Sequence, residues 1–219
     1  MASWAYTPTF RGFKSHFGFY NGATDYWSHC HPEATPYGPL DMHWGASPNT
    51  PASPVFGVNG TADRNTSDYG PFLFARETLR LLNTHAAAAA AAAAASTPPP
   101  PSLFLYLTHQ SVHEPLQAPQ EYVARCAATV PDKLPKRRIF CGMVAALDDA
   151  VQTVTDRMEQ LGLWKDTLFV FQVKSFFSRL LASARLFSHM TLILAGGQRW
   201  EPSHVRVQFP PQGRQVHPF

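Results

Sequence analysis

Residues 103–119 read LFLYLTHQSVHEPLQAP, and this stretch decides the predicted fold. The five apolar residues 103–107 have the length and the bounding turns of a fully buried strand. A polar turn with two histidines, a glutamate and a proline follows the strand directly. The rest of the chain has to show whether this turn is a catalytic site or a capped loop.

A long amphipathic helix and a second apolar strand follow. Residues 141–161 predict the helix, because apolar side chains recur at helical spacing and Gly162 suits the position after the last turn. These apolar residues are Val144, Leu147, Val151, Val154, Met158 and Leu161. TLFVF, residues 167–171, predicts the second buried strand. We therefore expect two adjacent or near-adjacent parallel strands with the helix crossing over between them, in a sheet covered on both faces.

This order of elements gives the turn after residue 107 a particular place. It lies at the carboxyl end of a parallel strand, where open α/β sheets bind ligands. Upstream, PFLFARETLRLLNTH at 71–85 predicts a helix that starts with a proline. Residues 86–101, alanines followed by STPPPP, indicate a solvated low-complexity insertion, since alanine favours helix and proline forces extended structure. Residues 32–71 are rich in Pro, Gly, Asn and Ser and indicate a long surface excursion.

Composition and charge narrow the class of protein. The 219 residues are 45% hydrophobic and 15% charged, which suits one folded domain with a core. Residues 1–172 hold 12 Lys and Arg against 14 Asp and Glu, whereas residues 173–219 hold six against one. The basic character therefore belongs to the last segment, and we expect no nucleic-acid partner for the chain.

The features that bear on the cell compartment disagree. MASWAYTPTF at the N-terminus shows no signal peptide, and we expect no membrane span because no uncharged apolar segment approaches about 20 residues. Asn59 and Asn65 nevertheless begin glycosylation sequons, which also arise by chance in such loops. Cys30, Cys126 and Cys141 predict neither a disulfide framework nor a zinc site with paired close spacing.

Candidate chemistry in the turn centres on His113. An imidazole there could protonate a leaving oxygen or bind an oxyanion, but the spacing alone favours a loop histidine bonded to backbone. His109 is interpreted as structural. Glu114 could orient a histidine or cap the loop, and the residues alone do not separate these roles.

Two further clusters of charge are interpreted as solvated surface. Asp148 and Asp149 lie about 100° apart on the predicted helix, so their carboxylates do not converge on a metal ion or a substrate. Lys133, Lys136, Arg137 and Arg138 form a basic cluster before the helix, where phosphate or sulfate could bind.

Several motifs in order resemble one family. PSLFLYLTHQSVHEPLQAPQEYV, followed by CGMVAALDDAVQTVTDRMEQLGLWKDTLFVF, is similar to the sulfatase family, in its arylsulfatase B-like branch. There a strand runs into a Q-[AS]-[VP]-H-x-P-L-x-[AV]-P loop, then a helix with an LD[ED]xV core. RGFKSHFGFYNGATDYWSH, residues 11–29, resembles the family's R-G-F-D-x-x-F-G-[FY] segment. The resemblance covers roughly residues 11–171.

This resemblance implies a fold and an activity. The implied fold is the α/β/α sandwich of the alkaline-phosphatase type, with a mostly parallel sheet. The implied activity is hydrolysis of small-molecule or glycan sulfate esters at Ca²⁺, with a formylglycine made from cysteine. His113 falls on the family's histidine that contacts the sulfate ester and can assist the leaving group. A complete member is expected to be secreted or to reside in a lysosome or vacuole.

The departures from the family pattern are large. None of the three cysteines begins the C-x-[PS]-x-R signature, and the Asp-Asp and Asp-Asn calcium ligands have no counterpart. We therefore expect residues 1–172 to be a partial catalytic domain, inactive alone and supporting neither cofactor. Residues 173–219 are expected to be a basic, non-homologous, poorly ordered tail, such as a retained intron would encode. A non-catalytic binding or structural protein that reuses half of the fold, or a phosphoesterase of the same superfamily, remains as an alternative.

Overall fold

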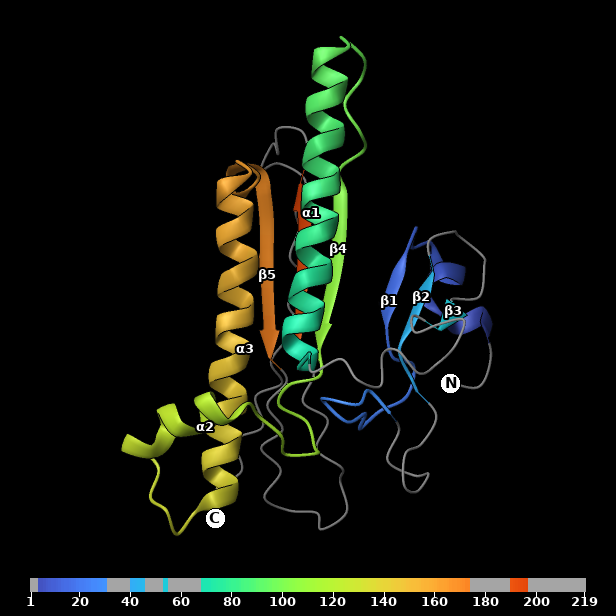
Figure 1. Cartoon of the computed structure of the whole chain (residues 1–219). Coiled ribbons are helices and arrows are strands. Elements are labelled where there is room, and N and C mark those ends of the chain that lie inside the picture. Colours follow the sequence, from blue (N-terminus) through green and yellow to red (C-terminus); the bar gives the residue numbers. More distant parts are fainter. Residues whose placement is uncertain (1–3, 31–39, 46–52, 55–67, 174–189, 197–219) are drawn as a thin grey trace, which may run out of the picture.

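The larger sheet contains the strand predicted from residues 103–107. Its order is β4–β6–β5, formed by Leu103–His109, Met190–Gly196 and Thr167–Val173. The computed structural model (Figure 1) describes residues 4–30, 40–45, 53–54, 68–173 and 190–196. Asn59 and Asn65, the glycosylation candidates, lie outside these residues.

β4 and β5 run parallel to each other, as the sequence predicts, with one strand between them. Each pairs antiparallel with β6, so that Leu103 and Thr167 both lie opposite Gly196. The prediction of near-adjacent parallel strands is thus confirmed. The sequence did not predict β6, which comes from the basic segment 173–219 and makes this part of the sheet mixed.

Helix α1 is longer than predicted. It spans Gly70–Ala94, and it runs on through most of the alanine segment and projects past the sheet (Figure 1). The prediction that the helix ends at residue 85 is wrong. Alanine has the highest helix propensity, and nothing before the prolines interrupts the backbone hydrogen bonds. The prolines at 98–101 lie in the extended connection to β4.

Helix α3, Pro135–Gln160, crosses from the turn region to β5. It begins six residues before the predicted start, so Lys136, Arg137 and Arg138 lie in its first turn and not in a loop. Its buried face also differs from the predicted one, because Val144 is 45% exposed. The buried residues of α3 are Gly142, Met143, Ala146, Ala150, Val154 and Met158.

Small residues explain that rotation of α3. A Cβ atom on Gly142 would lie 3.0 Å from the backbone nitrogen of Val123 and 3.2 Å from Cβ of Ala118. The α3 backbone therefore approaches the segment 118–123 closely, and Ala146 and Ala150 continue this face of the helix at a spacing of four residues. An amphipathic pattern based on large apolar residues does not capture contacts made by small ones.

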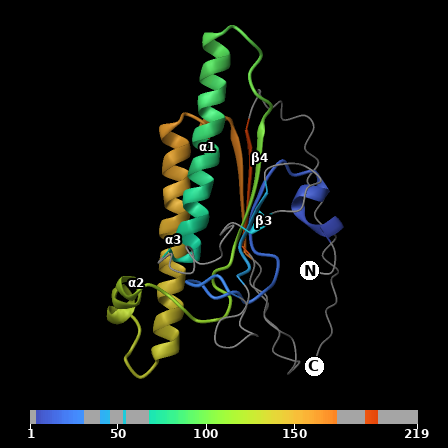
Figure 2. The ribbon, with the colours of Figure 1, turned by 45° about the vertical axis from the view of Figure 1, so that its right-hand side comes forward.

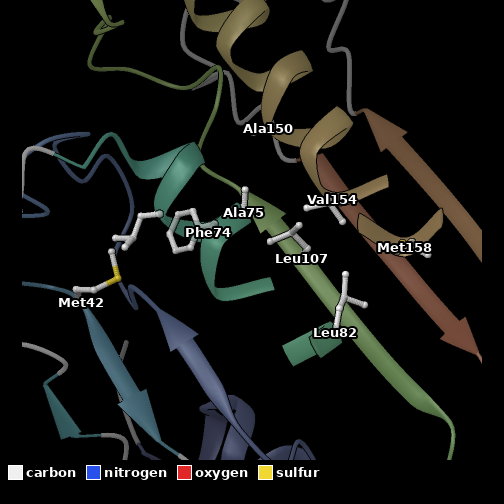
Figure 3. Packing of buried hydrophobic residues seen from close by; sticks show 9 residues of the cluster. Met42, Phe74, Ala75, Leu82, Leu107, Ala150, Val154 and Met158 are labelled. Atoms are coloured by element: carbon white, nitrogen blue, oxygen red, sulfur yellow. The ribbon is translucent and has the colours of Figure 1, made fainter. Parts of the chain in front are cut away.

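The core lies between α1, α3 and the sheet. Figure 3 shows Leu82 of α1, Leu107 of β4, and Val154 and Met158 of α3 converging in one cluster, and each is at most 7% exposed. Val154 and Met158 were predicted to be buried, and they are. This core joins the crossover helix to the strand that leads into the histidine turn.

The two faces of the sheet are covered unequally within the described residues. α1 and α3 lie on one side, and the N-terminal segment lies on the other (Figure 2). On that second side Phe104, Tyr106, Leu168 and Val170 are 37–55% exposed, although Phe13 packs 5.9 Å from the Phe104 ring. The prediction of two fully buried strands in a sheet covered on both faces is therefore wrong for this part of the chain.

A disulfide bond corrects the interpretation of the cysteines. Cys126 lies in η3, Cys126–Ala128, directly after α2, Gln120–Arg125, and it is bonded to Cys141 of α3. The two Cα atoms are 6.1 Å apart. Fifteen residues of sequence separation gave no indication that α2 folds back onto α3, and this packing is what brings the thiols together. Cys30 is buried and unbonded.

The N-terminal part forms a smaller antiparallel sheet. β1, His16–Gly18, pairs with β2, His43–Gly45, which pairs with β3, Ser53–Pro54. The short helices η1, Trp4–Tyr6, and η2, Pro8–Arg11, precede it, and η4, Trp164–Asp166, leads into β5. Among the described residues no helix combines the length and the apolar character needed to cross a bilayer.

Candidate functional site

The loop that leaves the carboxyl end of β4 contains the predicted site. It spans residues 110–119, between His109 at the end of the strand and the start of α2 at Gln120. Gln110 and Ser111 are buried, whereas His113 is half-buried and Glu114 is exposed. The chain therefore passes from the core to the surface between Ser111 and Glu114. His113 lies at this transition.

Backbone carbonyls hold His113 in place. Its Nδ1 lies 2.7 Å from the carbonyl oxygen of Glu114, and its backbone N–H donates to the carbonyl of Gln110 at 3.0 Å. A carbonyl oxygen only accepts, so Nδ1 carries a proton, and Nε2 has the lone pair when the ring is neutral. Glu114 thus orients the histidine through its main-chain carbonyl and not through its carboxylate.

Tyr26 anchors the same loop from the N-terminal segment. It is completely buried, and its hydroxyl hydrogen is shared between the carbonyls of His113, at 2.9 Å, and Gln110, at 3.1 Å. Burial raises the pKa of this hydroxyl, and the nearby Tyr69 raises it further, so it stays a donor. The two segments are 87 residues apart in sequence, which is why sequence reasoning missed this contact.

Gln117 and Asp25 form a second connection between these segments. The Gln117 side chain accepts from the backbone N–H of Tyr26 at 2.8 Å and donates to Asp25 at 2.6 Å. Burial opposes ionisation of Asp25, but hydrogen bonds from Ser28, Gln117 and Trp27 outweigh this, and the net effect lowers its pKa. Asp25 and Tyr26 belong to the segment 11–29 that resembles the family, but nothing in that segment indicated a contact with Gln117.

The inner part of the site is polar and buried. Gln110 donates its side-chain N–H to the carbonyl of Thr24, and a Cβ atom on Gly70 would lie 3.0 Å from the other end of that amide. Neither ring nitrogen of His109 has a hydrogen-bond partner in the described structure, and burial lowers its pKa to about 4. His109 is therefore part of the packing under the loop, in line with its structural interpretation.

The other charged candidates lie away from His113. Asp149 accepts from the Tyr122 hydroxyl at 2.9 Å and from Arg125 at 2.8 Å, so it connects α3 to α2, while Asp148 is exposed. The hydrogen bonds from Arg125 and then Tyr122 lower the pKa of Asp149. Arg138 donates to the carbonyl of Val130 and pairs with Asp132. Lys133, Lys136 and Arg137 remain exposed, as the surface interpretation expects.

The residues near His113 do not fit the cofactors of a sulfatase site. Ca²⁺ takes six to eight oxygen ligands, and in the described part of the chain no three His, Cys, Asp or Glu side chains converge on a metal position. Asp25 and Asp41 already accept hydrogen bonds from neighbouring backbone. Cys126 and Cys141 are consumed by the disulfide, and Cys30 begins no C-x-[PS]-x-R sequence.

The geometry defines an α/β protein with a histidine loop at the carboxyl end of a sheet strand. Comparison with known proteins identifies its family: the model named Sulfatase matches residues 3–172, and the chain belongs to the sulfatase family. Its α/β fold is accordingly the alkaline-phosphatase-like one.

Individual relatives agree with this assignment. Arylsulfatase J of Mus musculus is 25% identical over 164 residues, which are 75% of this chain and 23% of the relative. The crystal structures of Ps i-CgsB, alone and in complex with k-i-k-neocarrahexaose, match with a TM-score of 0.54 and 17% identity. Each match covers 93% of this chain and 43% of the chain in the solved structure. The chain thus spans about a quarter of the curated relative and less than half of the solved structures.

Proposed function

We propose that this chain is part of an arylsulfatase-type sulfuric ester hydrolase and contains the residue that assists the leaving group. That residue is His113, which contacts the sulfate ester. The anchored loop supports this role: His113 follows the carboxyl end of β4, and Glu114, Gln110 and Tyr26 hold its ring and backbone. A residue that acts on a bound ester needs such a defined position.

The proposed chemistry uses Nε2 of His113. With Nδ1 donating to the Glu114 carbonyl, a protonated ring offers its Nε2 proton to the oxygen that leaves when the ester is cleaved. General acid assistance of this kind contributes about 10²–10⁴-fold to a rate. Enzymes reach about 10⁶-fold or more, so this group alone does not make an efficient hydrolase.

The nucleophile and the cation are therefore proposed to come from outside these 219 residues. In this proposal residues 1–172 are the partial catalytic domain and residues 86–101 are an insertion within it. Residues 173–219 are a segment without family resemblance, of which residues 190–196 add β6 to the sheet. The family match over residues 3–172 supports the first boundary.

The substrate class is proposed to be sulfate esters of glycans or small molecules. Support comes from the family and from the neighbour whose title names a complex with k-i-k-neocarrahexaose. The compartment is proposed to be one reached by secretion, either extracellular or lysosomal or vacuolar. The disulfide between Cys126 and Cys141 supports this, because such bonds form and persist in oxidising environments.

A chimera tests the role of His113. Residues 103–171 would replace the matching segment of mouse Arylsulfatase J, and hydrolysis of an aryl sulfate would be measured with calcium and formylglycine-generating enzyme present. His113→Ala should lower kcat by about 10²–10⁴-fold. Glu159→Ala, at an exposed position on α3 of the same segment, should leave kcat unchanged. An active chimera that is indifferent to His113→Ala would contradict the proposal.

Two further measurements separate the alternatives. The 219-residue chain alone should not hydrolyse the aryl sulfate, even with both supplements. A chimera that prefers an aryl phosphate would support a phosphoesterase. Binding of a sulfated oligosaccharide by the chain alone in calorimetry, with no turnover by the chimera, would favour the non-catalytic binding protein.

A further inference from the structure

Four histidines among the described residues have a buried ring nitrogen without a hydrogen-bond partner. His43 of β2 is one of them, but its Nε2 is paired with Asp41 at 3.1 Å. The other three, His16 of β1, His29 and His109, have no ion pair in the described structure. His29 and His109 are each 1% exposed. Nε2 of His16, Nε2 of His29 and both nitrogens of His109 are buried and have no partner in the described structure. A protonated imidazole needs solvation or an anion for each N–H, so these sites favour the neutral ring.

The surroundings of His16 do not offset its burial. Its ring stacks on Tyr20 at 4.9 Å, and Tyr20 stacks on His43 at 4.6 Å. Asp41 is the nearby anion, but it is bonded to Nε2 of His43 at 3.1 Å and to the backbone of Tyr20 and Asn21. Burial, followed by repulsion from His43, lowers the pKa of His16 to about 4, against weaker opposing effects of Gly18 and Asp41.

His29 and His109 are similar. Burial lowers the pKa of His29, although a hydrogen bond with the Asp68 backbone and the charges of Asp25 and Asp68 act in the opposite direction. The Asp25 carboxylate is occupied by Ser28 and Gln117. For His109 burial is the cause, and no charged group in the described structure counteracts it.

We propose that these buried imidazoles make the fold acid-labile, which favours the extracellular medium over the acidic lysosomal or vacuolar lumen among the proposed compartments. The native state keeps the rings neutral, whereas the unfolded chain takes up a proton on each ring below pH 6.5. The contribution of these neutral rings to the free energy of unfolding is therefore present above pH 6.5. It is lost as the pH falls from 6.5 toward about 4. Asp41, with a pKa lowered to about 2, contributes its loss only at lower pH, below its ordinary 3.8.

Urea unfolding of the full 219-residue chain at about pH 7 and about pH 5 tests this proposal. Between these two pH values the folding equilibrium constant should fall by about 20-fold for each of His16 and His109. His109→Leu removes one titrating ring and an unsatisfied polar group, so its loss should be about 20-fold smaller than that of the wild type. His16→Phe keeps an aromatic ring beside Tyr20 and should act in the same direction. The control His85→Gln, at a partly exposed position on α1, should behave like the wild type.

A direct titration makes the result independent of how the variants fold. Nitrogen-15 NMR of the histidine rings should show His109 still neutral at about pH 5. A titration midpoint of His109 near 6.5 would overturn the proposal. So would equal acid losses in His109→Leu and the wild-type chain. The readout is stability and proton uptake, so it stands or falls separately from the proposed hydrolase role.

Discussion

The two faces of the β4–β6–β5 sheet differ in what covers them. On one face Leu107 packs with Leu82, Val154 and Met158 of the helices, and it is 7% exposed. On the other face Phe104 and Tyr106, from the same strand, are about half exposed and meet the Phe13 ring. The strand is apolar on both faces, but the described residues supply a complete cover for only one. Apolar composition alone therefore does not say which side of a strand contributes to stability.

The largest expected difference compares one leucine from each environment. Leu82→Ala removes a side chain that is 1% exposed in the helix-covered core, and it should lower the free energy of unfolding by about 2–5 kcal/mol. Leu168→Ala, at a position 47% exposed on the other face, should cost less than about 1 kcal/mol. Urea unfolding measures both. Equal losses would mean that the second face is as well packed as the first.

The disulfide gives the next largest effect on the helical side. Cys141→Ser opens a loop of 15 residues between η3 and α3, and the free energy of unfolding should fall by about 3 kcal/mol. Cys30→Ser changes the unbonded cysteine and is the control for loss of a sulfur atom. Adding a reductant should destabilise the wild type and the Cys30 variant but leave Cys141→Ser unchanged. If reductant affects all three alike, the bond is not the cause.

Gly142→Val tests the close approach of α3 to the segment before it. Because even a Cβ atom at this position would be 3.0–3.2 Å from Val123, Ala118 and Tyr122, the substitution should destabilise the chain by about 1–3 kcal/mol. Val144→Ala, on the exposed side of the same helix, is the matched control and should change stability by less than about 0.5 kcal/mol. A larger loss of stability for Val144→Ala than for Gly142→Val would indicate that Val144 is buried, as the sequence pattern predicts.

The smallest effect on stability is expected on the uncovered face. Tyr106→Thr combined with Leu168→Thr places β-branched residues, which strands favour, at both positions and should change the free energy of unfolding by no more than about 1 kcal/mol. The same change should reduce self-association, since exposed apolar side chains on a sheet promote it. Sedimentation velocity measures the association. Unchanged association together with a large loss of stability would show that this face is buried in solution.

The elements of the central unit were predictable, whereas their boundaries and contacts were less so. Length and apolar character predicted β4, β5 and the crossover helix, and the order of these elements predicted that the strands are parallel. β6 could not be predicted in this way, because its position between the two strands depends on long-range pairing and not on local pattern. The start of α3 was missed because basic residues at 136–138 indicate a loop as readily as a first helical turn.

The histidine loop shows the same division. Motifs along the chain were sufficient to single out His113, and the resemblance to sulfatases gave it a role. The hydroxyl of Tyr26 and the amide of Gln117 became part of the site only through contacts between segments more than 80 residues apart. No spacing rule connects such positions, since the contact exists only after the segments have packed.

The sequence by itself determined the class of the fold, the family and the address of the candidate site, because local apolar patterns and short motifs encode them. The tertiary structure decided which face of α3 is buried, which cysteines are bonded and which histidines are left without partners. These properties depend on which atoms meet across distant segments, on how closely small residues let backbones approach, and on how much water is excluded around each ring.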